Sequence, residues 1–394
     1  MPRPDLDIAV LGGGLAGGLI ALALTKARPE LRLAVIEAGA TFGGNHIWSF
    51  FASDVAPADR WLTDPLVAAW WDGYDVRFPD HARRLATPYT SATSERLDMW
   101  LRETLPAGML LTGLTVDAAT QASVTVGDST LTAGGVIDAR GASGGLAHMA
   151  GGWQKFLGCL VRLEEPHELE RPIVMDADVA QLDGYRFVYC LPFSHDEVFI
   201  EDTYYSDAPD LDRKTLARRI EAYASEQGWR IADVTREESG VLPVIAQGDF
   251  AAFWRAGGDI ARAGARAGLV HPLTSYSLPD AVRFATHLAQ LDDLSGASLA
   301  RESYAWAQAH WRQGSFYRML AKMLFGASTP ATRYKLLERF YRLPQPLIER
   351  FYAGRSTRLD KLRVLTGKPP VPVGAAVSAL RGGGFPLSPL KVPA

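Results

Sequence analysis

The sequence predicts an α/β protein with a Rossmann-type dinucleotide-binding domain, a β-sheet substrate domain and a C-terminal helical region. An apolar strand, a glycine-rich turn and a small-residue helix open the chain. Strand-like runs dominate the middle, and a basic, helix-like segment begins near residue 301. The chain has 394 residues, of which 47% are hydrophobic and 22% charged, so it is long enough to bury a large core.

The first predicted elements are a strand at Asp7–Leu11, a helix at Leu15–Lys26 and a second buried strand at Leu31–Ile36. No charged residue occurs between Ile8 and Thr25, which imitates a membrane span or a signal peptide. Five glycines interrupt this stretch, and the charges before it have both signs. These features favour a strand–turn–helix unit over a signal or spanning segment.

The turn between the first strand and helix has the G-x-G-x-x-G pattern. Gly12 permits the tight turn, Gly14 allows a pyrophosphate close to the backbone, and Gly17 allows helix and strand to pack closely. Free N–H groups at the helix start suit phosphates, and an acid twenty residues after the last glycine suits a ribose. The predicted cofactor-binding residues are Gly12, Gly14, Leu15, Ala16, Gly17 and Glu37.

Three further segments resemble parts of flavoproteins and favour FAD over NAD(P) as the ligand of this turn. They are residues 43–46 after the second strand, residues 93–97 opening a helix, and residues 135–141 forming a strand that ends in a polar turn. For Arg96, a solvated surface charge is as good an interpretation as a phosphate contact. These segments add Gly44, Asn45, Arg96 and Asp138 to the predicted cofactor contacts.

Two strand-like runs, Tyr185–Phe193 and Glu197–Tyr205, predict an antiparallel hairpin in the middle of the chain. Strand alternation places the neighbours Glu201 and Asp202 on opposite faces, so both face one pocket only if a bulge intervenes. From spacing alone, a solvent-facing edge strand is a slightly better interpretation than a catalytic acid.

Residues 264–279 form a loop in which His271–Pro272 forces a turn. Pro279 suits the first turn of a following helix, whose N-terminus would face an anionic cofactor. Two interpretations of His271 remain, a general base and a structural group with satisfied hydrogen bonds, and the second is the more common.

Residues 301–368 carry fourteen Lys and Arg against four Asp and Glu, although the whole chain has a net charge of -3. Aromatic residues are interleaved with these charges. The pattern fits either cationic helices on an anionic lipid surface or a basic bundle packed on the acidic remainder. No nucleic-acid motif accompanies the charge, so nucleic acid is not an expected partner. The Pro- and Gly-rich tail from Pro369 is predicted to be extended.

Together these segments resemble the bacterial lycopene β-cyclase family over nearly the whole chain. The resemblance rests on the glycine turn and Glu37, the run of residues 43–50, the Phe199–Thr203 strand, the loop of residues 271–279, and the runs 340–343 and 351–355. The acidic strand and the His–Pro loop are the most specific parts. One departure is Ser275, where the family usually has Gly, and it puts the local turn geometry in doubt.

The resemblance implies an isomerase that converts the linear ends of lycopene into β-rings without net redox change, with γ-carotene as the intermediate. It implies Glu201 as the acid catalyst, which reverses the preference drawn from spacing, with Asp202 in a supporting role. It also implies reduced FAD as the active cofactor and NADPH as the reductant. His271–Pro272 then counts among the cofactor contacts, and His271 or the flavin is an option for the final base.

Lycopene resides in the bilayer, so the resemblance favours membrane contact for the basic segment. A peripheral protein on the cytoplasmic membrane face is expected, with other carotenoid-pathway enzymes as possible partners. The two cysteines, Cys159 and Cys190, and the lack of a CxxC motif suit a reducing compartment without a cysteine metal site. No metal site is predicted.

The expected cofactor domain is discontinuous and comprises residues 1–75, 93–160 and 255–300. Residues 161–254 are expected to form the substrate-binding sheet domain, and residues 301–394 the helical, membrane-facing region. Two rival functions fit the same scaffold. One is an FAD-dependent monooxygenase or prenyl-lipid reductase, and the other is a non-catalytic flavin-bound carotenoid carrier.

Overall fold

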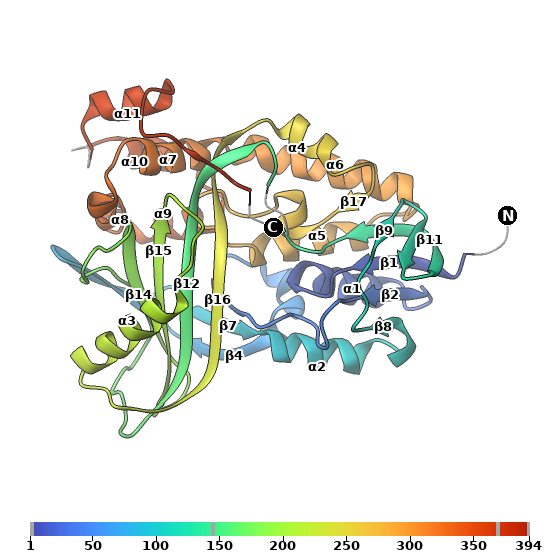
Figure 1. The fold of residues 1–394 in the computed structure, drawn as a ribbon, viewed down its shortest axis with the longest axis horizontal. Helices are drawn as coiled ribbons and strands as arrows, with labels where there is room; N and C mark the ends of the chain where they lie inside the picture. Colours follow the sequence, from blue (N-terminus) through green and yellow to red (C-terminus); the bar gives the residue numbers. More distant parts are fainter. Residues whose placement is uncertain (1–3, 143–145, 368–370, 392–394) are drawn as a thin grey trace.

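The computed structural model describes residues 4–142, 146–367 and 371–391. It has two halves lying side by side, one built on a parallel sheet and the other on a long antiparallel sheet (Figure 1). The predicted α/β class, with a Rossmann-type unit, a second sheet and C-terminal helices, is confirmed. In the part of the chain that the structure describes, no helix is long and apolar enough to cross a membrane.

The first half is the predicted Rossmann-type unit. Its sheet has the order β8-β2-β1-β11-β10-β9, with β17 also paired to β11. The strands β1, β2, β8, β11 and β17 pair in parallel with one another, and β10 and β9 continue the sheet antiparallel from β11. Their bounds are β1 Leu6–Leu11, β2 Leu33–Ile36, β8 Leu110–Leu111, β9 Ala118–Ala119, β10 Ser123–Val126, β11 Ser129–Asp138 and β17 Ala261–Arg262.

Helices cover this sheet and fix the glycine turn against it. Helix α1 (Leu15–Ala27) packs against α5 (Leu278–Ala289), and α2 (Ser94–Thr104) lies next to α1. Helix α6 (Gly296–Gln313) packs on β11 and β17, so its first turns extend the cofactor half beyond residue 300. Buried aliphatic side chains of β1 and α1 form the centre of this core.

The second half is an eight-stranded sheet with the order β16-β12-β15-β14-β13-β5-β6 and a short β18 beside β12. The predicted hairpin is confirmed as β14 and β15, which pair antiparallel. Strand β15 lies between β12 and β14, so the edge-strand interpretation of the acidic run is wrong. The bounds are β5 Tyr74–Phe78, β6 His81–Leu85, β12 Met149–Leu163, β13 Ile173–Asp176, β14 Tyr185–Pro192, β15 Glu197–Ser206, β16 Ile231–Gly248 and β18 Ser388–Pro389.

A small three-stranded sheet joins the halves, with β7 (Tyr89–Thr93) between β3 (Ile47–Phe51) and β4 (Val67–Trp71). Helix α3 (Arg213–Glu226) packs on the outer face of β12 and β15. Helix α4 (Phe250–Ala256) packs on α6. The predicted boundary at residue 160 falls inside β12. This strand pairs with β15 on both sides of residue 160, so it belongs to the second sheet as one element.

The C-terminal region is helical, as predicted, and lies over one end of the second sheet (Figure 1). Its helices are α7 Ser315–Gly326, α8 Tyr334–Phe340, α9 Gln345–Tyr352, α10 Arg358–Leu365 and α11 Val373–Leu380. The tail was predicted to be extended, but residues Val373–Leu380 form the helix α11, which packs on α7. Pro372 precedes this helix and Gly374 lies in its first turn, where both are tolerated. Residues 369 and 370, where that tail was predicted to begin, lie outside the described residues.

The aromatic residues of this region were one reason to expect lipid contact, but most of them are core residues. Phe325, Tyr341 and Phe351 are buried against the second sheet and against each other. Most of the large apolar side chains that are exposed here are instead aliphatic residues of α10 and α11, although Phe385 and Tyr304 are also exposed. Both cysteines are buried and free of disulfides.

Candidate active site

The glycine turn has the geometry that its sequence predicts. Gly12 has φ +90°, and a Cβ on Gly17 would lie 1.9 Å from the carbonyl oxygen of Gly12. A Cβ on Gly14 would meet nothing within 4 Å, so open space adjoins the backbone there. Leu15 and Ala16 are the first residues of α1, whose first turn holds no acid and has no side-chain cap. Their N–H groups are therefore available to an anion.

Glu37, at the end of β2, supports the turn directly. One carboxylate oxygen accepts the N–H of Gly13 at 2.7 Å, and the other accepts the N–H of Gly39 at 2.8 Å. The carboxylate stays partly exposed beside the turn. Its contact with a ribose stays a prediction.

Asp138 ends β11 beside the turn and is held by two arginines. Arg140 donates to both carboxylate oxygens at 2.9 Å, and Nε of Arg266 donates to one of them at 3.1 Å. Burial acts to raise the pKa of Asp138, but these cations outweigh it and hold the pKa below its usual range. Arg96 is exposed in the first turn of α2 and has no ion-pair partner among the described residues. Both cofactor roles stay predictions.

Residues 43–46 lead from the glycine turn to a cavity in the second half. The N–H of Gly43 donates to the carbonyl oxygen of Gly13, and Gly43 and Gly44 both have positive φ. The side-chain amide of Asn45 donates to the carbonyl oxygen of Glu237 on β16. Strand β3 then begins at the wall of this cavity. The loop of residues 43–46 therefore links the predicted cofactor-binding turn to the cavity.

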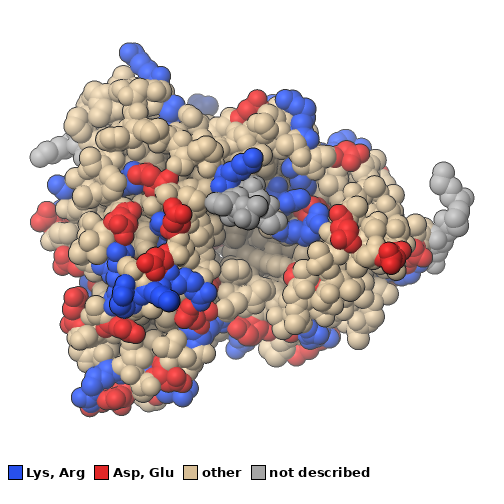
Figure 2. Space-filling view, in the orientation of Figure 1, with Lys and Arg blue, Asp and Glu red and all other residues tan. Residues whose placement is uncertain are grey.

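The cavity, called here the Glu201 cavity, has a volume of about 250 Å³ and lies between the small sheet, the second sheet and the loop of residues 274–279. Figure 2 shows the surface hollowed between the two halves of the molecule. The wall of the Glu201 cavity is mainly aromatic and aliphatic, with a few polar groups. The wall includes Trp48, Tyr89, Gln154, Phe156, Tyr189, Phe199, Glu201, Glu238, Tyr276 and Leu278.

Glu201 is the acidic group that the hairpin presents to this cavity. Burial raises the pKa of Glu201 to about 8, while a hydrogen bond from the Thr203 hydroxyl at 2.5 Å opposes the rise. The nearby charges of Glu238 and Asp202 raise the pKa further. A carboxyl with this pKa is mostly protonated at neutral pH, as proton donation requires.

Asp202 lies on the opposite face of β15, because the pairing of this strand has no bulge at these positions. Its side chain is fully buried, and Nε of Arg186 contacts its two oxygens at 2.9 and 3.1 Å. The geometry therefore places Asp202 outside the cavity, and its predicted catalytic role is reduced to an indirect charge effect on Glu201.

Glu238 was missed by sequence reasoning. It is buried on β16, accepts the N–H of Ile47 at 2.9 Å and lies 3.0 Å from Nδ1 of His46. The sequence holds a signal for it, because Glu237–Glu238 is a second pair of adjacent acids in a strand. Tyr89 was also missed; its hydroxyl is buried at the cavity and has no hydrogen-bond partner among the described residues.

The His271–Pro272 loop forms one wall between two cavities. Its turn passes through Ser275, which has φ +59°, a conformation that favours glycine and explains the usual family residue. The Ser275 hydroxyl donates to the carbonyl oxygen of Pro243 at 2.7 Å. The turn therefore adopts the glycine-like conformation although serine stands at position 275, and the departure from the usual family residue does not disrupt it.

His271 itself is a buried structural group. Its Nε2 lies 3.2 Å from the carbonyl oxygen of Phe351, and its Nδ1 accepts the N–H groups of Leu273 and Thr274. Burial lowers the pKa of His271 to about 4. With both ring nitrogens engaged, it is not suited to be the general base.

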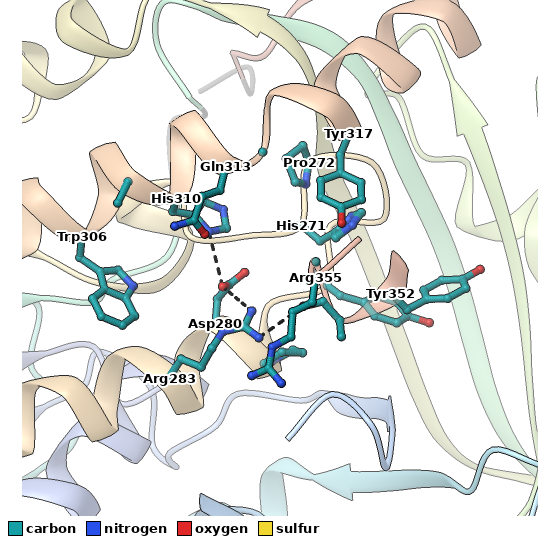
Figure 3. Close-up of a pocket in the computed structure, with 16 residues that line it drawn as sticks. His271, Pro272, Asp280, Arg283, Trp306, His310, Gln313, Tyr317, Tyr352 and Arg355 are labelled. Atoms are coloured by element: carbon teal, nitrogen blue, oxygen red, sulfur yellow. Dashed lines mark hydrogen bonds and ion pairs between the residues drawn. The ribbon is translucent and has the colours of Figure 1, made fainter. Parts of the chain in front are cut away.

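A second cavity of about 250 Å³ lies behind this loop (Figure 3). In it Asp280 accepts a hydrogen bond from Arg283 at 2.8 Å and lies 3.4 Å from His310. Burial acts to raise the pKa of Asp280, but His310 and Arg283 hold it well below its usual range. This cluster ties α5 to α6 and fixes the loop that faces the Glu201 cavity.

The family model described as "Lycopene cyclase protein" matches residues 7–378. The chain is 46% identical to a lycopene beta-cyclase of Pseudescherichia vulneris over 94% of this chain and 96% of that protein. It is 42% identical to a lycopene beta-cyclase of Pantoea ananas, with 96% and 98% covered.

Solved structures share the fold at low sequence identity. A geranylgeranyl bacteriochlorophyll reductase-like protein from Thermoplasma acidophilum has a TM-score of 0.60 and 12% identity, with 96% and 98% of the two chains covered. A flavin-dependent brominase has a TM-score of 0.57 and 13% identity, with 89% and 93% covered. These likenesses show the fold of the two halves described above.

Proposed function

The chain belongs to the lycopene cyclase family, and from this membership we propose that it is a lycopene β-cyclase. It closes the linear ends of lycopene into β-rings, through γ-carotene to β-carotene, as an isomerase without net redox change. The observation that carries the proposal is Glu201, a carboxyl with a pKa of about 8 on the wall of a largely apolar cavity.

Ring closure needs a proton donor in a site that excludes water. The Glu201 carboxyl donates its proton to C2 of the terminal alkene, which leaves a tertiary cation at C1. The C5=C6 bond then attacks C1, the cation moves to C5, and loss of the C6 proton gives the β-ring. The aromatic wall, with Trp48 and Tyr276 at the cavity, suits a cation because aromatic faces attract positive charge and do not trap it.

The residues present fit FAD. The open space at Gly14 and the uncapped start of α1 are binding features that the protein alone leaves unused. The glycine turn and Glu37 would hold the dinucleotide part, and residues 43–46 lead toward the Glu201 cavity. When bound in its reduced form, with NADPH as the proposed reductant, FAD would supply negative charge that stabilises a cation. The proposal of NADPH rests on the resemblance of the sequence alone.

We also propose that the protein works at the cytoplasmic face of a membrane, because its hydrocarbon substrate resides there. The net positive charge of residues 301–368 supports this proposal.

The function is tested by expression in cells that accumulate lycopene, followed by pigment analysis. We expect γ-carotene and β-carotene to replace lycopene. Hydrogenated or hydroxylated lycopene would contradict the proposal and favour a reductase or monooxygenase. Unchanged lycopene bound to a flavin-loaded protein would favour a carrier.

The acid is tested with Glu201→Gln, which keeps the shape of the side chain but cannot deliver the proton. We expect cyclisation to fall by roughly 10²–10⁴-fold, the contribution of a general acid, with flavin content unchanged. Glu201→Asp should be weaker than the wild type but active. Glu197→Gln, on the same strand, partly exposed and outside the cavity wall, is the matched control. Full activity of a folded, flavin-loaded Glu201→Gln protein would remove Glu201 from the mechanism.

A further inference from the structure

A third cavity, called here the apolar chamber, lies under the C-terminal helices and has a volume of about 270 Å³. Aliphatic and aromatic side chains of α7, α8, α10 and α11 form nearly all of its wall. Among the described residues that line it, only Arg339 is charged, and this side chain donates to the carbonyl oxygen of Thr366. A chamber with this lining suits a hydrocarbon and offers no anchor for a polar ligand.

A small cavity of about 20 Å³, called here the tyrosine constriction because Tyr185, Tyr189, Tyr205, Tyr276 and Tyr352 line it, lies between the apolar chamber and the Glu201 cavity. The constriction shares Leu273, Leu324, Leu337 and Phe351 with the chamber. It shares Gln154, Tyr189, Thr274 and Tyr276 with the Glu201 cavity. The three spaces therefore follow one another in series through the protein.

The outer end of the chamber opens between α10 and α11. Leu365, Val373, Val377 and Leu380 line the chamber and are also exposed, so they form its rim. On α11, Val373, Val377 and Leu380 follow helical spacing and share one face. Leu359 and Leu362 of α10 are 77% and 59% exposed beside them. In Figure 2 the surface over α11 is mostly free of charged side chains.

The charges that accompany this rim are basic. Arg358, Lys361 and Arg363 lie on α10, and Arg381 follows α11. The acid of α10, Asp360, is buried and paired with Arg350. Exposed aliphatic side chains, on helices whose cations form no ion pair among the described residues, match an anionic lipid surface, in which the apolar groups enter the acyl layer and the cations meet the headgroups.

We propose that the polyene enters from an anionic bilayer between α10 and α11, and that its uncyclised part occupies the apolar chamber while its end group reaches Glu201 through the tyrosine constriction. The inference rests on the proposed cyclase function. It assigns a holding site to the part of the substrate that is not reacting. The narrow constriction separates the end group at Glu201 from the rest of the chain, which remains in an apolar environment.

The rim and the exposed leucines of α10 are tested together. The variants are Val377→Asp on the rim and Leu362→Asp on α10, both in the full-length, flavin-loaded protein and called here the rim variants. The matched controls are Met99→Asp and Val234→Asp, since these apolar residues are 49% and 48% exposed on other surfaces. Each protein is sedimented with vesicles of phosphatidylethanolamine and phosphatidylglycerol. We expect the rim variants to lose about tenfold or more in vesicle affinity, and the controls to bind like the wild type. Equal binding of rim and control variants would overturn the lipid-facing rim.

The chamber is tested with Leu337→Trp, which fills it near the constriction, and with Leu337→Met as the volume-conserving control. Tritiated lycopane, the saturated analogue of lycopene, measures binding without any reaction. We expect Leu337→Trp to lose lycopane binding and lycopene turnover but to keep flavin and vesicle binding, and Leu337→Met to keep all four. Unchanged lycopane binding in a folded Leu337→Trp protein would overturn the chamber.

The two tests separate this inference from the function. A wild-type protein that binds lycopane and vesicles but forms no rings contradicts the cyclase proposal. It leaves the proposed entry at the rim and the proposed holding site in the apolar chamber intact. A Leu337→Trp protein that forms rings at the wild-type rate contradicts the holding site in the apolar chamber but not the cyclase proposal.

Discussion

At the scale of single residues, the two neighbouring acids of β15 have opposite environments. Glu201 faces a cavity and accepts a hydrogen bond from the hydroxyl of Thr203, its one side-chain donor among the described residues, and burial raises its pKa to about 8. Asp202 faces a buried guanidinium and forms an ion pair. The strand period of two separates the roles, and the surroundings decide which carboxyl can act as an acid.

The pKa of Glu201 predicts the pH dependence of cyclisation. Because the protonated form is the donor, the rate should be flat below about pH 8 and fall about tenfold per pH unit above it. Since the Glu238 carboxylate raises this pKa, Glu238→Gln should move the fall to lower pH. Initial rates of the reduced enzyme between about pH 6 and 10 measure both effects. A flat profile over this range would contradict the assignment.

Asp202 should contribute to stability more than to chemistry. Asp202→Asn leaves the Arg186 cation buried without its charged partner, and loss of one member of such a pair costs about 3–5 kcal/mol of unfolding free energy. Urea unfolding measures this loss, and turnover per folded, flavin-loaded molecule should stay close to the wild type. A stable Asp202→Asn protein without turnover would contradict this and show that Asp202 is needed for catalysis.

At the scale of elements, the site depends on strand ends, helix starts and the loops between them. The glycine turn, the loop of residues 43–46 and the Ser275 turn each contain a residue with positive φ. Glycine supplies this conformation in the first two, and Ser275 is held by its hydrogen bond to Pro243. The sequence could predict the glycine turn because its pattern is local. It could not predict the support of Ser275, because Pro243 lies on a strand distant in the chain.

Two glycines of the same turn should respond differently to alanine. A Cβ at Gly14 meets open space, so Gly14→Ala should leave the unfolding free energy within about 0.5 kcal/mol and weaken flavin binding. A Cβ at Gly17 overlaps the carbonyl oxygen of Gly12, so Gly17→Ala should destabilise the apoprotein by about 1–3 kcal/mol. Thermal unfolding and flavin absorbance measure the two effects. Equal effects of both variants on apoprotein stability would contradict a ligand-binding role for the space at Gly14.

At the scale of the whole molecule, charge and apolar exposure are distributed unevenly. The chain has a net charge of -3, yet residues 301–368 are strongly basic, so the remainder is acidic. Several cations of this segment bind acids within the protein, as Arg333 binds Asp207. The cations on α10 lie instead beside the exposed leucines, at the mouth of the apolar chamber.

This distribution predicts salt-sensitive binding to anionic membranes. Raising the salt from about 0.05 to 0.5 M shortens the range of charge interactions and should weaken binding to phosphatidylglycerol vesicles several-fold. Binding to purely zwitterionic vesicles should be weak at both salt concentrations. Sedimentation of the full-length protein measures this dependence. Binding that ignores both lipid charge and salt would contradict the role of the basic segment.

The sequence by itself determined the Rossmann-type unit, the β14–β15 hairpin and the placement of Glu201 and Asp202 on opposite faces of the strand, since each depends on local spacing. It also indicated a helical C-terminal region, although its aromatic residues proved to be core and α11 was not predicted. Only the tertiary structure decided that β15 is an interior strand, that Glu238 faces the same cavity as Glu201, and that His271 is satisfied structurally. These outcomes depend on burial and on partners from distant strands. Desolvation, which raises the pKa of Glu201, arises only when those strands and loops enclose it.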